Sequence, residues 1–304
     1  MSQGGSVVKC AACFGEEFSQ TQPIPEISVQ KCLGCGLLVS NIVRTKPVAA
    51  EFDRINERAY FNGLGTVRAQ QAVEALSFVT TYTATKGDWL DVGCSFGYLL
   101  SEARRSGFEI FGIEPDQKAC EYARGLLGEK VVHLGLMTPD LRPDASADVV
   151  SLMDVLEHVP AGELTEFGNT IRKNVRAGGL VLFKVPSTDG LYFQIAHRMA
   201  RITRLLAPGM IKRLWQSEYE FPHTVYFNER SLRIYLENHG FEVVAHKYIE
   251  DVPNKTVIDR LVMDETVPRW QAYLIAPAFY LINFAGRIRA KSDAMLMLAR
   301  RTET

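Results

Sequence analysis

The spacing of hydrophobic residues along the chain alternates between the period of a helix and the short apolar runs of buried strands. Residues 67–79 place apolar side chains three and four positions apart, which predicts an amphipathic helix. Helical patterns also cover 116–124 and 163–174. Short apolar runs, which predict strands, lie at 89–92, 108–114, 131–134, 147–153, 180–186, 241–249 and 294–301. Strands that alternate with helices predict an α/β fold, with a parallel sheet covered on both faces.

The first of these strands leads directly into a glycine-bearing turn. The run at 88–92 is followed by the turn Gly93-Cys94-Ser95-Phe96-Gly97 and then by a helical pattern that stops at Gly107. Backbone N–H groups in such a turn, and the N-terminus of the helix after it, face a single ligand. Glu114 ends the next strand, where a carboxylate can accept hydrogen bonds from ribose hydroxyls. The pattern predicts a nucleotide-type ligand, and a purely structural glycine turn is the alternative.

Together with Asp91, the turn reads D-x-G-x-S-x-G, which is not the G-x-G-x-x-G of dinucleotide-binding folds. It resembles the first motif of the class I S-adenosylmethionine-dependent methyltransferases, D-x-G-x-G-x-G. Ser95 replaces the middle glycine and needs more room near the methionine part of the ligand. The segments DVVSLMDVLEHV, RAGGLVLFKVPS and HTVYFNERSLRIYLENHGFEVV also resemble this family, so the likeness covers roughly residues 86 to 250. It implies a Rossmann-like seven-stranded methyltransferase sheet with helices on both faces, the last strand lying antiparallel beside the fifth.

The same resemblance implies where S-adenosylmethionine binds. The glycine turn would approach its methionine part, and Glu114 its ribose. Leu136 and Met137, just beyond the third strand, would flank the adenine. Asp154, at the end of the fourth strand, would lie beside the methionine amino group or near the substrate. The positions expected to bind the cofactor are Asp91, Gly93, Cys94, Ser95, Gly97, Glu114, Pro115, Leu136, Met137 and Asp154.

Four of the six cysteines stand together near the start of the chain. Cys10-x2-Cys13 and Cys32-x2-Cys35 have the spacing of a four-cysteine zinc ribbon, in which two tight turns complete a tetrahedron. Because protein would fill all four positions, we expect a structural Zn²⁺ that supplies folding energy. The first residues show no signal peptide, so we expect reduced thiols and a cytoplasmic protein. A role of the four cysteines without metal is the alternative.

These features divide the chain into three parts. They are a zinc ribbon at 1–46, a helical lead-in at 47–85, and a methyltransferase domain at 86–304 with insertions at about 187–222 and 252–290. In the lead-in, Tyr60 and Phe61 could cover the cofactor or pack in the core.

Both insertions are rich in apolar residues. The second contains AYLIAPAFYLINFAG, which is too short and too interrupted to span a bilayer. A basic amphipathic helix such as the one expected in the first insertion can lie on a membrane surface. We favour a lid and a packing helix, with peripheral membrane contact as the alternative. The helix in the first insertion is expected to place Leu191, Ile195, Met199, Ile202 and Leu206 on one face and Arg198, Arg201 and Arg204 on another.

Four residues are candidates for catalysis: His158, His223, Asp154 and Glu157. His158 directly follows the fourth strand, and His223 lies where the first insertion rejoins the core; we favour His158 as the general base. A histidine that only bonds to backbone is the alternative for His158. In addition, Asp154, Glu157 and His158 resemble the carboxylate-and-histidine site of the quinone-ring O-methyltransferases, which leaves a divalent ion open.

The expected function is S-adenosylmethionine-dependent methylation of a small molecule or saccharide, with O-methylation favoured. A cysteine-rich module ahead of such a domain resembles bacterial enzymes that methylate sugars, saccharides and natural products. An RNA-modifying methyltransferase with a zinc module and a non-catalytic binding protein are the alternatives. A net charge of −1 and few basic residues in 1–46 argue against nucleic acid as the partner. The apolar content of 47% and charged content of 23% are ordinary for a globular protein.

Overall fold

The structure is a computed structural model of the chain. It describes residues 9–43, 64–138, 147–202, 207–219, 221–262, 268–289 and 291–303. Tyr60 and Phe61, and with them most of the predicted lead-in, lie outside the described residues.

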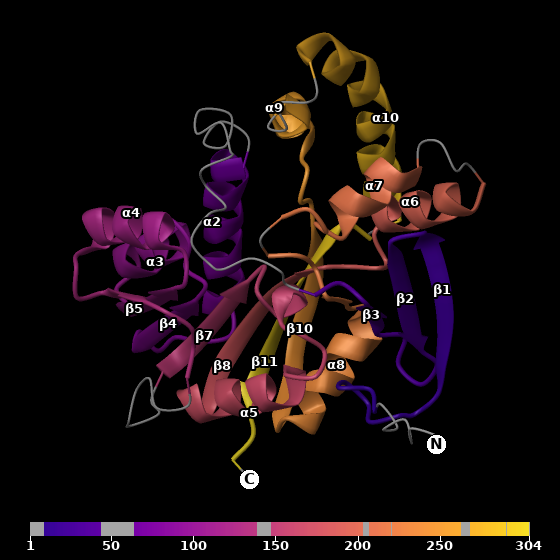
Figure 1. Cartoon of the computed structure of the whole chain (residues 1–304). Coiled ribbons are helices and arrows are strands. Elements are labelled where there is room, and N and C mark those ends of the chain that lie inside the picture. Colours follow the sequence, from indigo (N-terminus) through magenta and orange to yellow (C-terminus); the bar gives the residue numbers. More distant parts are fainter. Residues whose placement is uncertain are drawn as a thin grey trace.

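A seven-stranded sheet forms the centre of the molecule (Figure 1). Its strand order is β10-β11-β8-β7-β4-β5-β6. β11 lies antiparallel between β8 and β10, while β4 pairs in parallel with β5 and β7. This confirms the predicted Rossmann-like sheet and its antiparallel last strand. The strands are β4 (Asp88–Val92), β5 (Glu109–Glu114), β6 (Val132–Leu134), β7 (Ala147–Met153), β8 (Val175–Pro186), β10 (Phe241–Ile249) and β11 (Ala294–Arg301).

Helices cover both faces of this sheet because successive strand residues point to opposite sides. Trp89 and Val149 belong to one buried cluster with α2, α3 and α4. Leu90 and Val150, the next residues along, belong to a second cluster with α5 and α8. The helices are α2 (Thr66–Thr80), α3 (Tyr98–Arg105), α4 (Gln117–Leu127), α5 (Leu164–Asn174) and α8 (Glu229–Asn238).

A second, four-stranded sheet joins the cysteine-rich segment to the large domain. Its order is β1 (Phe18–Ile24), β2 (Ile27–Cys32), β3 (Leu38–Ser40) and β9 (Val225–Tyr226). Since Leu38 pairs with Tyr226, the small sheet ends on a strand from the far part of the chain. Part of the apolar burial that stabilises the N-terminal segment therefore comes from the large domain. The boundary at residue 46 stays a prediction.

The two insertions lie at the end of the sheet where its parallel strands finish (Figure 1). The first forms α6 (Leu191–Ile202) and α7 (Ala207–Leu214), and the second forms η4 (Asn254–Thr256), α9 (Val257–Val262) and α10 (Arg269–Ile288). Ile202, near the end of the predicted apolar face of α6, is 81% exposed; Leu206 and Arg204 lie outside the described residues. Within the described ranges, no helix is long and apolar enough to cross a membrane.

Candidate active site and cysteine cluster

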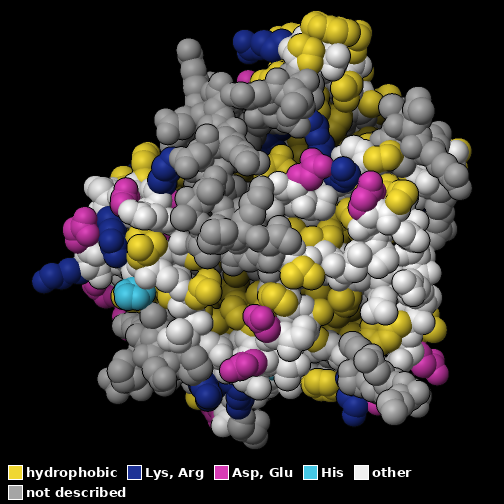
Figure 2. All heavy atoms as spheres, viewed as in Figure 1, with side chains coloured by type: hydrophobic (Ala, Val, Ile, Leu, Met, Phe, Trp, Pro, Cys, Tyr) yellow, Lys and Arg dark blue, Asp and Glu magenta, His cyan; other side chains and the backbone are white. Residues whose placement is uncertain are grey.

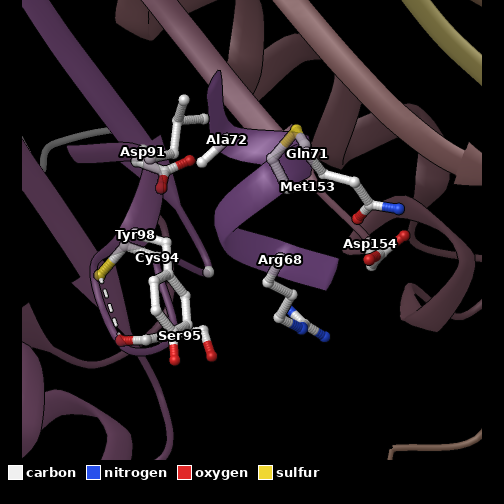
Figure 3. Close-up of a pocket in the computed structure, with 11 residues that line it drawn as sticks. Arg68, Gln71, Ala72, Asp91, Cys94, Ser95, Tyr98, Met153 and Asp154 are labelled. Atoms are coloured by element: carbon white, nitrogen blue, oxygen red, sulfur yellow. Dashed lines mark hydrogen bonds between the residues drawn. The ribbon is translucent and has the colours of Figure 1, made fainter. Parts of the chain in front are cut away.

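A pocket opens at the carboxyl ends of β4 and β7, beside α2 (Figure 3). Of the residues predicted to bind a cofactor, Asp91, Gly93, Cys94, Ser95 and Asp154 line it. Figure 3 shows the turn residue Ser95 on one side of this space and Asp154 on the other. Open α/β sheets bind ligands at this edge, outside the carboxyl ends of their strands. Half of the predicted positions therefore share one cavity, and their contact with a cofactor stays a prediction.

The glycine turn owes its shape to a left-handed backbone. Gly93 and Gly97 have φ values of 70° and 79°. A Cβ at Gly93 would lie 2.7 Å from a methyl of Val155, so only glycine fits there without a shift. Ser95 also has a positive φ, 50°, a conformation that costs a non-glycine residue energy. The residue that departs from the family motif is therefore held in a strained backbone conformation.

Glu114 supports this strained residue. Its Oε2 accepts a hydrogen bond from the Ser95 N–H at 2.7 Å, and its Oε1 accepts one from the Asp116 N–H at 2.9 Å. Burial raises the pKa of the Glu114 carboxyl. Each carboxylate oxygen can accept more than one hydrogen bond, so these contacts leave capacity for a hydroxyl. The expected role at a ribose stays a prediction.

Besides Gly97 and Glu114, three other predicted positions lie away from the pocket lining. Leu136 is 62% exposed on the loop after β6, and Met137 packs against the cluster beneath α5 and α8. Pro115 follows Glu114 and is half-buried. The contact of Leu136 and Met137 with an adenine is therefore still a prediction, as is the role of Pro115.

Asp91 is buried at the base of the pocket. It accepts a hydrogen bond of 2.6 Å from the Ser151 hydroxyl, whose oxygen in turn accepts one from the Trp89 indole at 2.8 Å. Burial raises the pKa of Asp91 to about 7, although the bond from Ser151 opposes this. A carboxylate in such surroundings favours a cationic partner.

Helix α2 and β8 contribute residues that the sequence analysis missed. Arg68 and Gln71 line the pocket from α2, and Figure 3 shows Arg68 between the glycine turn and Asp154. Lys184, on β8, is 1% exposed and donates to both oxygens of Asp154 at 2.6 Å and to Asp251 at 2.8 Å. Burial alone would lower the pKa of Lys184, but the two carboxylates raise it. A lysine inside the apolar run LVLFKVP is the signal that could have identified this network.

Three of the four predicted catalytic residues come together. Glu157, His158 and His223 offer ligand atoms that lie within 4.8 Å of one another, and the two imidazole rings are 4.9 Å apart. Asp154 is bound to Lys184 instead. The Glu157 carboxyl is 1% exposed, and its Oε2 has no hydrogen-bond partner among the described residues. Burial raises the pKa of Glu157 and lowers that of His158 to about 4.

Hydrogen bonds fix which ring nitrogens carry protons. The Pro222 carbonyl can only accept, so His158 donates to it through Nδ1 at 3.1 Å. The Tyr226 hydroxyl donates to the Leu214 carbonyl at 2.7 Å, so it accepts from Nδ1 of His223 at 3.0 Å. Both histidines therefore keep an unprotonated Nε2. The bond to Pro222 also matches the backbone-bonded alternative for His158.

The four N-terminal cysteines form one compact cluster. Sγ of Cys10 lies 3.6 Å from Sγ of Cys35, and Sγ of Cys13 lies 3.4 Å from that of Cys32. All four sulfurs lie within 4.8 Å of one another. Sulfurs around Zn²⁺, with bonds of about 2.3 Å, stand about 3.8 Å apart in a tetrahedron. The donor set fits a zinc ion, as the spacing predicted.

Comparison with known protein families gives a match over much of the chain. Residues 65–246 match a family model described as a methyltransferase domain. This range contains the pocket, the glycine turn and the group formed by Glu157, His158 and His223.

Among curated proteins, two ubiquinone biosynthesis O-methyltransferases are similar to parts of the chain. The one from Azoarcus sp. (strain BH72) is 33% identical over 99 residues, which is 31% of this chain and 42% of the relative. The one from Rickettsia akari (strain Hartford) is 24% identical over 148 residues, 45% of this chain and 58% of the relative. The matched part thus spans about half the length of these relatives.

Among solved structures, a SAM dependent methyltransferase from Archaeoglobus fulgidus superposes with a TM-score of 0.52 at 17% identity. The match covers 77% of this chain and 94% of that one. At this level of identity, the likeness supports the fold.

Proposed function

The chain belongs to the methyltransferase-domain family, and on this basis we propose that it transfers a methyl group from S-adenosylmethionine to a small molecule or saccharide, with oxygen as the favoured acceptor atom. The observation that carries the proposal is the pocket at the ends of β4 and β7, formed by the left-handed turn with Asp91 at its base. The partial likeness to two O-methyltransferases favours oxygen and a small acceptor over RNA.

The residues of the pocket suit such a cofactor. Its methionine part carries an ammonium group and a sulfonium, both cationic, and Asp91 and Asp154 are the acidic side chains that line the cavity. Gly93 lines the pocket and has no side chain, so the backbone of the turn can approach a ligand closely. Glu114 would bind the ribose while it holds Ser95 in place. Leu136 and Met137 are proposed to flank the adenine.

S-adenosylmethionine supplies a methyl group on a positively charged sulfur, so the chain has to align the acceptor and remove its proton. We assign that proton to Nε2 of His158, because this nitrogen is unprotonated and His158 follows the strand that ends at the pocket. His223 is the second candidate, since its Nε2 is unprotonated in the same way. Asp154, held by Lys184, would position the acceptor or the cofactor's amino group.

A divalent ion at Glu157, His158 and His223 is the alternative to a free base. The unpartnered Oε2 of Glu157 favours it, because a buried carboxyl oxygen without a partner is costly. Such an ion would lower the pKa of the acceptor hydroxyl. The test is turnover in a chelator that leaves the zinc in place. Unchanged turnover supports the free base. Turnover that is lost and then restored by Mg²⁺ or Mn²⁺ supports the ion.

For the cysteine cluster we propose a structural Zn²⁺. Four protein ligands leave no open position for a substrate, so the ion would stabilise the turns around Cys10, Cys13, Cys32 and Cys35 without taking part in catalysis. Reduced thiols of this kind suit a cytoplasmic protein, and that location is likewise a proposal.

The test of the function uses S-adenosylmethionine with a labelled methyl group. Catechols, other phenols, reducing sugars, a primary amine and unmodified transfer RNA serve as acceptors. We expect label in a hydroxylated small molecule and none in RNA. Label confined to RNA, or confined to the amine, would contradict the proposed acceptor class.

A further inference from the structure

Helix α10 exposes more large apolar side chains than any other element in the described part of the chain. Trp270 is 63% exposed, Leu274 72% and Ile288 71%. Figure 2 shows hydrophobic side chains gathered at the upper end of the molecule, where Figure 1 places α10. The exposed set is Trp270, Tyr273, Leu274, Ile275, Tyr280, Leu281, Phe284 and Ile288. An apolar face of this kind marks an interaction surface.

The helix buries its small residues and exposes its large ones. Its buried positions are Ala272, Ala276, Asn283 and Gly286. A helix that packs only on its own protein places its large apolar residues inward. Here the orientation is fixed by polar contacts, because Asn283 donates to the Val252 carbonyl at 2.9 Å and accepts from the Tyr192 hydroxyl at 3.1 Å. The fold therefore holds the large side chains outward.

Five of these side chains, at positions 270, 274, 281, 284 and 288, lie on one stripe of the helix. Together with the exposed Pro277, they follow one another at steps of four and three, which is one face of a helix. Over its 20 residues, α10 runs for about 30 Å. Arg269 and Arg287 lie on one flank of the stripe, one near each end, because eighteen residues make five helical turns.

Helices α6, α7 and α10 and the turn after α10 contain basic but no acidic residues, although the whole chain has a net charge of −1. Residues 268–291 contain four basic residues and no acidic one, and neither α6 nor α7 contains an acidic residue. Glu250 pairs with Arg287, Glu218 with Lys212 and Asp189 with Lys291, which offsets part of this charge. The basic residues of these helices and the adjoining turn are Arg198, Arg201, Lys212, Arg213, Arg269, Arg287, Arg289 and Lys291.

We propose that α10 lies in the surface of an anionic lipid bilayer, with its apolar stripe toward the acyl chains and its arginines at the level of the phosphates. A helix that is amphipathic, basic and bordered by aromatic residues has the composition of an interfacial helix. The helix is not long and apolar enough to cross the bilayer. This inference does not depend on methyl transfer.

A second copy of the chain is the other occupant considered, and the charges disfavour it. In a twofold contact, each patch meets its own copy, so the basic end of one chain would oppose that of the other. Like charges brought together in this way weaken association, whereas anionic headgroups are attracted by them.

The experiment is flotation of the full chain with vesicles of phosphatidylcholine containing about 30% phosphatidylglycerol, and with vesicles of phosphatidylcholine alone. We expect binding to the anionic vesicles that weakens at ~0.5 M salt through screening of the charges. Trp270 supplies a second readout, since Trp89 and Trp215 are fully buried. Its emission should shift to the blue on binding. Wild-type protein that stays unbound with unchanged emission would overturn the proposal.

Matched variants distinguish binding through the apolar stripe from nonspecific adsorption of the protein. Leu274→Glu with Leu281→Glu should weaken vesicle binding by at least about tenfold, because two leucines would lose their contact with lipid. Val73→Glu with Leu126→Glu places the same charges at two apolar residues elsewhere, each 53% exposed, and should leave vesicle binding unchanged. Equal loss in both pairs would overturn the proposal. So would a dimer, detected by light scattering, that the first pair dissociates and that does not bind vesicles.

Discussion

The cysteine cluster and the pocket at the ends of β4 and β7 both bring reactive side chains together. Of the two, only the cluster offers a full set of four ligands for one ion. Its four sulfurs lie close enough to surround one ion and offer no further position. The group of Glu157, His158 and His223, which lies outside the pocket lining but shortly after the pocket residue Asp154, keeps free acceptors. Oε2 of Glu157 has no partner in the described structure, and the two histidines present an unprotonated Nε2. The first arrangement suits a structural ion, and the second leaves groups that suit a ligand.

The backbone around the cysteine cluster also differs from the backbone around the pocket. The cluster is fixed by local turns, since Phe14 donates to the Cys10 carbonyl and Gly36 to the Cys32 carbonyl, at 2.8 and 2.9 Å. The pocket collects residues from distant strands and from α2, with Ser95 in a costly backbone conformation. Strain and unpaired groups are more often found where function requires them. Four changes test this contrast, beginning with the largest expected effect.

Cys32→Ser should remove the metal and unfold the N-terminal sheet. Zinc binding in small four-ligand sites contributes apparent free energies on the order of 10 kcal/mol, part of which folds the segment. Elemental analysis should find about one zinc per chain in the wild type and almost none in the variant. Cys120→Ser, a buried cysteine outside the cluster, is the control and should keep its zinc. A wild type that is fully folded without metal would contradict a structural zinc site.

His158→Ala should lower turnover by a factor of roughly 10² to 10⁴, the usual cost of losing a general base. Cofactor affinity should change little, because His158 does not line the pocket. His133→Ala, at an exposed position on β6, is the control. Near-normal turnover in His158→Ala, together with a large loss in His223→Ala, would assign the proton to His223 instead.

Glu114→Ala should weaken cofactor binding by about 1.5–3 kcal/mol, the usual loss for a hydrogen bond to a charged group. The structure adds a second reading, because Glu114 also holds Ser95. Glu114→Gln keeps an oxygen for the Ser95 N–H and separates the two. If binding is lost in both variants while the thermal midpoint is kept in the glutamine variant, the carboxylate contacts the ligand. Lower stability with normal affinity would make Glu114 purely structural.

Cofactor affinity should rise with pH between about 6 and 8. Burial raises the pKa of Asp91 to about 7, so the carboxylate form that attracts a cation becomes the main form as pH increases through this range. Below the pKa, affinity should fall by at most tenfold for each pH unit, since one proton must leave. Asp91→Asn should be weaker and flat over this range. A wild-type profile without slope would mean that Asp91 does not meet the cationic ligand.

Much of the fold was predictable because strands buried on both faces appear as continuous apolar runs. The runs at 89–92 and 147–153 became β4 and β7. The pairing of β3 with Val225–Tyr226 was not predictable, because a two-residue strand has no pattern of its own. It depends on how the first insertion returns to the core.

The candidate site was predictable where backbone shape dictates residue type, as at Gly93, and where the motif contains a carboxylate, as at Asp91. It was missed where the chemistry comes from packing. Lys184 is a single polar residue in an apolar run, and its carboxylate partners come from two distant loops. The outward face of α10 was missed because both of its faces are apolar, and only contacts such as that of Asn283 with Val252 decide which one is buried.

Binding of S-adenosylmethionine to the purified wild-type chain tests the central claim most directly. Titration calorimetry should give a dissociation constant in the micromolar range, corresponding to about −8 kcal/mol. A nicotinamide dinucleotide in the same cell should give no heat of binding. Absence of binding by S-adenosylmethionine and by its demethylated product, or preference for the dinucleotide, would contradict the account.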